Sequence, residues 1–253
     1  MQAYGAAFAR IYNLRWAGFA SRAAPLLRAY YQSTLPSAPE GRHLLDLCCG
    51  TGQLSAHFLE NGYTVTGLDL SSHMLEFARE NCAAYIVAGQ ARFIVGDASA
   101  YTLDTPAHLA ISTFDALNHL PDLDALLGCF SCTWKALLPG GMFIFDLNTR
   151  LGLRGWASTH VEEDAELTLF THGLFDETGG KAYTRINGYL RAEDGRYDRF
   201  DETAYNTAFD LANVHAGLEQ TGWRGIHFAR LNDLATPLGD PEAEKRVFII
   251  AHK

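Results

Sequence analysis

The segment from Leu44 to Gly52 constrains the fold more than any other part of the chain. It reads Leu-Leu-Asp-Leu-Cys-Cys-Gly-Thr-Gly, an apolar strand that leads through a glycine turn into a helical pattern. Glycines in such a turn let the backbone approach a ligand closely, and the helix N-terminus offers unpaired N–H groups. By itself this turn predicts only a nucleotide-sized ligand at the carboxyl end of a strand.

Strands and helices alternate along most of the chain. Alternation of this kind predicts an α/β fold with a doubly wound, seven-stranded, mostly parallel sheet. The last two strands are joined by a hairpin-like loop, so we expect the last strand to be antiparallel. The predicted strands are 43–47, 63–68, 92–95, 109–113, 142–147, 223–229 and 246–251, and the predicted helices are 3–31, 53–60, 71–81, 123–138 and 210–220.

The region from residue 160 to 208 follows a different pattern. Its segments 161–175, 181–192 and 196–209 read as long strands, separated by the turn sequences Asp-Glu-Thr-Gly-Gly and Glu-Asp-Gly. Because no helical pattern lies between them, they predict an antiparallel meander inserted into the α/β domain.

Composition and charge exclude several classes of protein. The chain has 253 residues, 48% hydrophobic and 19% charged, which is typical of a soluble globular domain. A net charge of −9 without a dense basic run disfavours nucleic acid as a partner. No apolar run approaches the ~20 residues of a membrane span. Five cysteines, an odd number, favour reduced thiols and a cytoplasmic location. Cys129 and Cys132 have no matching second pair, so we expect no metal.

Three acids stand at the ends of predicted strands. Asp69 lies about twenty residues after the glycine turn, where an acid can accept both hydroxyls of a ribose. Asp97, in Gly96-Asp97-Ala98, could receive an exocyclic amine, and Asp146 ends the fifth strand. An NAD-dependent dehydrogenase would share the turn and the ribose acid, but it requires neither Asp46 within the first strand nor an antiparallel last strand.

Four segments of the chain, in order, resemble class I S-adenosylmethionine-dependent methyltransferases of the small-molecule type. They are the glycine turn, the stretch Gly-Leu-Asp-Leu-Ser-Ser-His-Met-Leu at 67–75, Gly96-Asp97-Ala98, and Leu-Leu-Pro-Gly-Gly at 137–141. The resemblance covers roughly residues 1–150 and the last two strands. It implies the Rossmann-like fold and S-adenosylmethionine as the cofactor, with S-adenosylhomocysteine as the product, and leaves the acceptor open.

The resemblance also implies roles for individual residues. Asp46 and the Gly50 backbone would hold the methionine end of the cofactor, and Asp69 the ribose hydroxyls. Leu70, Met74, Asp97 and Ala98 would surround the adenine. The complete set that we expect around the cofactor is Tyr4, Tyr12, Asp46, Cys48, Gly50, Gly52, Asp69, Leu70, Met74, Asp97, Ala98, Thr113 and Phe114.

The N-terminal run from Tyr4 to Asn13 is similar to a Tyr-x-x-Phe-Ala-x-x-Tyr-Asp element of the same family, which forms a lid over cofactor and acceptor. Asn13 replaces the usual Asp, so no charge role is carried over to that position. The alternative is that these aromatics belong to the core face of an amphipathic helix.

Candidates for catalysis cluster after the fourth strand. Asp115 and His119 are one helical turn apart and could face the acceptor together, His119 as a general base or a hydrogen-bonding clamp. The alternative is a histidine satisfied by a backbone group.

Candidates for acceptor binding come from three places. Asn118 lies in the same segment, and Asn148 and Arg150 follow the fifth strand, where the forked donors of Arg150 could bind a carboxylate. Tyr183 and Arg185 alternate along one face of the meander. We expect the meander to roof the acceptor pocket; it could instead form a dimer interface, so the chain would be a monomer or a homodimer.

We therefore predict one domain over 1–253, with a helical lid at 1–40, a core at 41–150 and 209–253, and the inserted cap at 160–208. It would transfer a methyl group to oxygen or nitrogen of a small molecule. The alternatives are a non-catalytic S-adenosylmethionine-binding protein, the dehydrogenase, and a methyltransferase acting on nucleic acid or protein.

Overall fold

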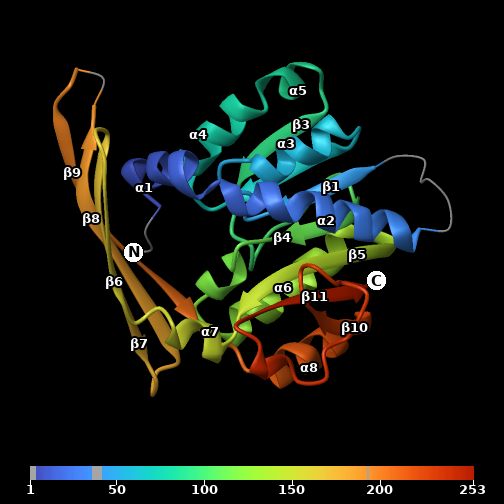
Figure 1. Ribbon diagram of the computed structural model, residues 1–253. Coiled ribbons are helices and arrows are strands. Elements are labelled where there is room, and N and C mark those ends of the chain that lie inside the picture. The colour runs from blue at the N-terminus through green and yellow to red at the C-terminus, as the bar shows by residue number, and fades with distance from the viewer. Residues whose placement is uncertain (1–3, 36–41, 193) are drawn as a thin grey trace.

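The computed structural model describes residues 4–35, 42–192 and 194–253. A seven-stranded sheet forms its centre, in the order β10-β11-β5-β4-β1-β2-β3 (Figure 1). Neighbouring strands pair in parallel except at β11, which is antiparallel to both β5 and β10, so the predicted fold class is confirmed. The strands are β1 (His43–Leu47), β2 (Thr64–Asp69), β3 (Ala91–Val95), β4 (Ala107–Ser112), β5 (Leu137–Asn148), β10 (Arg224–Ala229) and β11 (Arg246–His252).

Helices cover both faces of this sheet, since successive strand residues point to opposite sides. In β5, Met142 and Ile144 face the layer of α2, α3 and α4, whereas Phe143 and Phe145 face α6 and α8. Ser71 caps α4 as predicted, because its hydroxyl accepts a hydrogen bond from the Met74 N–H. The helices are α2 (Gly18–Thr34), α3 (Gln53–Glu60), α4 (Ser72–Asn81), α5 (Ala83–Val87), α6 (Leu123–Ala136), α7 (Arg150–Arg154) and α8 (Leu211–Thr221); α5 and α7 were not predicted.

The N-terminal helix is divided rather than continuous over 3–31. It consists of α1 (Ala6–Ile11), one π-helical segment (Tyr12–Trp16) and α2. Such π segments are rare and are frequently found at functional sites. The predicted linker at 35–41 lies outside the described residues apart from Leu35.

The inserted meander has four strands, not three: β6 (Thr159–Glu163), β7 (Leu167–Asp176), β8 (Lys181–Arg191) and β9 (Tyr197–Thr207). The prediction of one strand over 161–175 was wrong because Asp164 forms a turn. Its Oδ1 accepts hydrogen bonds from the N–H groups of Glu166, at 2.8 Å, and Leu167, at 3.0 Å. The turn reverses the chain, so β6 and β7 pair with each other.

One face of the meander packs against the N-terminal segment, and α1 lies between this sheet and the α/β core (Figure 1). One apolar cluster contains Ile186 and Leu190 of β8 and Phe200 of β9 together with Phe8 and Ile11 of α1. The opposite face carries exposed side chains, among them Tyr183 and Tyr189. We call these the inner and outer faces of the meander.

Candidate cofactor and acceptor site

A cavity of about 420 Å³ lies at the carboxyl ends of β1 to β4, beneath the N-terminal segment. Parallel strands end at the same edge of a sheet, which is why segments far apart in sequence meet there. All the residues predicted to surround the cofactor line this cavity except Asp46 and Gly52. They are Tyr4, Tyr12, Cys48, Gly50, Asp69, Leu70, Met74, Asp97, Ala98, Thr113 and Phe114.

Asp69 links the loops that follow β1 and β2. One carboxylate oxygen accepts a hydrogen bond from the Gly50 N–H at 2.8 Å, and the other accepts one from the Ser71 N–H at 2.9 Å. Burial raises the pKa of Asp69, and these N–H donors oppose that rise. Gly50 has φ +55°, and a Cβ on it would point to the Tyr12 ring, 3.6 Å away. A side chain there would occupy the cavity.

Asp46 and Gly52 support the glycine turn from behind instead of lining the cavity. The Asp46 carboxylate is buried and accepts a hydrogen bond from the Ser55 hydroxyl at 2.6 Å. Burial raises its pKa to about 7. Gly52, at φ +82°, is the N-cap residue of α3, and a Cβ on it would lie 3.1 Å from Ala78. Glycine at this position therefore permits α3 and α4 to approach each other.

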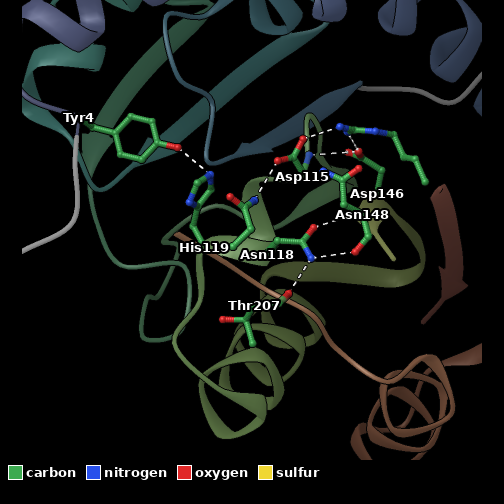
Figure 2. Close-up of polar contacts among 9 residues, drawn as sticks. Tyr4, Asp115, Asn118, His119, Asp146, Asn148 and Thr207 are labelled. Atoms are coloured by element: carbon green, nitrogen blue, oxygen red, sulfur yellow. Dashed lines mark hydrogen bonds and ion pairs between the residues drawn. The ribbon is translucent and has the colours of Figure 1, made fainter. Parts of the chain in front are cut away.

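His119 lies in the cavity wall and contacts the N-terminal segment. Its Nδ1 lies 2.8 Å from the Tyr205 carbonyl oxygen. Its Nε2 lies 2.7 Å from the Tyr4 hydroxyl, a contact drawn in Figure 2. A carbonyl can only accept, so Nδ1 carries the proton and Nε2 accepts from Tyr4. Burial lowers the pKa of His119 to about 4, which makes the imidazole neutral at pH 7.

Asp115 does not face the cavity with His119. Residues 116–119 form a 3₁₀ turn with three residues per turn, so His119 lies over Ala116, and these two line the cavity. Phe114 and Asp115 adopt left-handed conformations, at φ +66° and +51°. The Asp115 carboxylate turns toward Arg246, 2.5 Å away, and accepts a hydrogen bond from the Asn206 amide at 2.9 Å (Figure 2).

Arg246 joins two buried acids beneath the cavity. It pairs with Asp115 and Asp146, and its guanidinium lies over the Phe114 ring, 5.6 Å from the centroid. Burial raises the pKa of both acids, that of Asp146 to about 6, against the attraction of the guanidinium. The cluster holds the left-handed turn that aims Phe114 into the cavity. The sequence analysis did not predict this role of Arg246. Its position as a charged residue at the start of the apolar strand 246–251 was the available signal.

None of the five predicted acceptor residues lines this cavity. Asn118 is buried, donates to the carbonyls of Asn148 and Thr207, and accepts from the Asn148 N–H at 2.9 Å. It therefore ties β5 to β9. Arg150 pairs with Glu177 near the surface. Tyr183 and Arg185 lie on the outer face of the meander, because the even-numbered side chains of β8 take the inner face. Among the described residues, the meander contributes no side chain to the cavity wall.

The last part of β9 instead supports the part of the cavity wall that contains His119, without lining the cavity itself. Tyr205 holds His119, Asn206 holds Asp115, and the Thr207 hydroxyl donates to the Leu120 carbonyl at 2.7 Å. Glu202, on the inner face, accepts hydrogen bonds from the start of α1. The sequence signal for this role was polar Glu202 and Asn206 alternating with apolar residues on a face that packs inward.

Other predictions concern metals, thiols and membranes. Within the described ranges no group of three or more His, Cys, Asp or Glu residues could hold a metal ion. All five cysteines are free thiols. No described helix has the length and apolar character needed to cross a membrane.

Comparisons with known proteins agree with this geometry. Residues 44–141 match the family model described as a methyltransferase domain. "Putative methyltransferase YqeM" of Bacillus subtilis is 27% identical over 86% of this chain and 86% of its own length. A ubiquinone biosynthesis O-methyltransferase of Alkalilimnicola ehrlichii is 32% identical over 49% of each chain. The structure of an S-adenosylmethionine-dependent methyltransferase from Clostridium acetobutylicum superposes with a TM-score of 0.78 at 20% identity, covering 97% of both chains, a likeness that establishes the fold.

Proposed function

Since this chain is a class I S-adenosylmethionine-dependent methyltransferase, we propose that it methylates an oxygen or nitrogen of a small molecule. The cavity of about 420 Å³ lies within the usual range of small-ligand pockets, roughly 300–1,000 Å³. The N-terminal segment covers it, and the net charge of −9 opposes a nucleic-acid acceptor. The similarity to methyltransferases favours methyl transfer over the dehydrogenase and the non-catalytic alternatives.

The chemistry of the cavity wall fits the cofactor. Asp69 would accept hydrogen bonds from the ribose hydroxyls, Leu70 and Met74 would contact the adenine, and Asp97 would accept from its amine. The absence of a side chain at Gly50 leaves room for the methionine end. When bound, S-adenosylmethionine supplies a methyl group on a sulfonium, which a nucleophile in line with the bond can take.

His119 and Tyr4 are our candidates for proton transfer, and their contact inside the cavity is the observation that carries the proposal. Neutral His119 presents an unprotonated Nε2 to the Tyr4 hydroxyl. As the acceptor hydroxyl loses its proton to the Tyr4 oxygen, the Tyr4 proton moves to Nε2, and the Tyr205 carbonyl holds the resulting imidazolium. Asp115, predicted to share this work, would act by fixing the turn that carries Phe114.

The surroundings of His119 favour a hydroxyl over a cationic amine as the acceptor. Thr113, Phe114, Ala116 and Leu120 are uncharged, and the nearby Asp115 carboxylate is turned to Arg246. A protonated amine would add a second positive charge to that of the sulfonium without a counter-charge, whereas a neutral hydroxyl adds none. The comparisons include both chemistries, the ubiquinone biosynthesis O-methyltransferase and a sugar N-methyltransferase, KedS8, of similar fold.

Methyl transfer from labelled cofactor to a panel of phenols, alcohols, amines and carboxylates tests this function. With the best acceptor, His119→Ala should lower kcat about 100-fold, the usual contribution of a general base, while the affinity for S-adenosylhomocysteine changes little. His215→Ala, at a partly exposed position of α8 away from the cavity wall, is the control. If His119→Ala retains full turnover, His119 is structural; if the panel yields no product while a macromolecule is methylated, the small-molecule proposal fails.

The oligomeric state, monomer or homodimer, stays a prediction that concerns the outer face of the meander. It exposes Leu174 and Tyr189 beside the Arg185–Asp201 pair. A homodimer through this face and a monomer both remain compatible with the proposed function, because the outer face lies away from the cavity.

A further inference from the structure

We propose that Glu202 is a positioning residue: it clamps the N-terminal segment, residues 4–16, onto the inserted sheet and thereby sets Tyr4 over the cavity. Glu202 lies on β9, almost 200 residues away from that segment in sequence. This role makes the meander a clamp for the lid, in place of the roof that its position in the sequence suggested.

The Glu202 carboxylate caps α1. Its Oε2 accepts hydrogen bonds from the N–H groups of Tyr4, at 3.0 Å, and Gly5, at 2.9 Å, and its Oε1 accepts from the Phe8 N–H at 3.3 Å. The first N–H groups of a helix need such acceptors, and the residue before α1 is Gly5, which has no side chain to provide one. A negative charge at this end is also favoured by the helix dipole.

Gly5 fits closely against this carboxylate. A Cβ on Gly5 would lie 3.0 Å from Glu202 Oε1, closer than a side chain normally approaches. The contact therefore depends on both residues, Gly5 in the N-terminal segment and Glu202 in the meander.

Tyr4 needs this support because its backbone is strained. It has φ +100°, a conformation that residues other than glycine rarely adopt. Glu202 holds its N–H, and the Ser71 hydroxyl donates to its carbonyl at 2.7 Å. Fixed at both ends, Tyr4 places its hydroxyl on His119 Nε2.

The same strand fixes the partner of Tyr4. Tyr205, three residues after Glu202, holds His119 through its carbonyl oxygen. Strand β9 thus sets the two ends of the Tyr4–His119 hydrogen bond, one through a side chain and one through the backbone. Loss of Glu202 should release the lid while leaving His119 in place.

Variants at Glu202 test this clamp. In Glu202→Ala, amide exchange of the peptide containing residues 4–16 should speed up about tenfold, the effect of losing a helix cap. The affinity for S-adenosylhomocysteine should fall by about the same factor, because fewer molecules hold the lid closed. Glu202→Gln keeps one acceptor oxygen and should lie between Glu202→Ala and the parent. Asp198→Asn, on the same face of β9 with an exposed side chain, should behave like the parent.

The exchange and affinity measurements need no methyl acceptor, so they stand even if the proposed acceptor class is wrong. A general loss of packing would speed exchange in β1 and β4 as well and lower the thermal midpoint sharply. Either that outcome, or normal protection of residues 4–16 in Glu202→Ala, overturns the proposal. If Glu202→Ala does not fold, the same comparison is made with Glu202→Gln, where unchanged exchange and affinity again count against it.

Discussion

The two sides of the cavity are built in different ways. On the side proposed for the cofactor, Gly50 and Asp97 lie in the turns after β1 and β3, Asp69 is the last residue of β2, and backbone N–H groups hold the Asp69 carboxylate. On the acceptor side, the turn after β4 is held by side chains from distant strands, Arg246 from β11 and Asn206 from β9. The first side follows from local sequence, and the second requires the assembled fold.

This difference suggests how each side can vary. A cofactor side made of backbone turns needs only glycines and short acids, whatever the rest of the chain does. An acceptor side supported by an inserted sheet can change shape when the insertion changes. The last strand of the meander contacts His119, Asp115 and the N-terminal segment, so a change in the meander would alter this part of the cavity wall.

Among the variants that distinguish the two sides of the cavity, Asp69→Ala should have the largest effect, on the affinity for S-adenosylhomocysteine. Asp69→Ala removes the charged acceptor for the cofactor hydroxyls, and such hydrogen bonds contribute about 1.5–3 kcal/mol each. We therefore expect calorimetry to show about 100-fold weaker binding of S-adenosylhomocysteine. Asp69→Asn, which can still accept from the Gly50 N–H, should lose less.

Asp104→Ala, an exposed acid outside the cavity wall, is the control for charge alone. Unchanged affinity in Asp69→Ala would remove the basis for placing the cofactor on this side of the cavity.

The same difference explains what could be predicted from the sequence. The sheet, the glycine turn and the acids at strand ends follow from local patterns, and each was located within a few residues. Asp115 was placed on an ordinary helix, but its left-handed backbone depends on Arg246, 131 residues later. Which face of the meander turns inward could not be read from alternation alone. It depends on whether α1 packs against Ile186 or against Tyr183, a tertiary contact.

A smaller effect, on the free energy of unfolding, should come from Asp46, which is buried beneath the glycine turn. Burial raises the pKa of Asp46 from 3.8 to about 7, so the folded state binds this proton more tightly than the unfolded chain does. The resulting stability is complete below about pH 4 and is lost as the pH rises through 7. Without cofactor, the contribution of Asp46 to the unfolding free energy should therefore be on the order of 1 kcal/mol larger at pH 6 than at pH 8.

Asp46→Asn keeps the acceptor for Ser55 but does not titrate, so the change in stability between the two pH values should differ from that of the parent by this contribution. Denaturant unfolding of both proteins at the two pH values measures the difference. Parallel pH profiles for the two proteins would mean that Asp46 is ionised in the folded state.

The smallest effect should come from Arg185, on the outer face of the meander. Its guanidinium pairs with Asp201 at 2.7 Å, more than half exposed to solvent. Exposed pairs of this kind contribute little to stability, and Arg185→Ala should leave the unfolding midpoint, kcat and KM close to those of the parent. A raised KM for the acceptor with unchanged cofactor affinity would instead show that Arg185 contributes to acceptor binding. Because Arg185 lies away from the cavity of its own chain, that result would require a second copy to bring its outer face to the acceptor, and sedimentation of the active enzyme would then have to show a dimer.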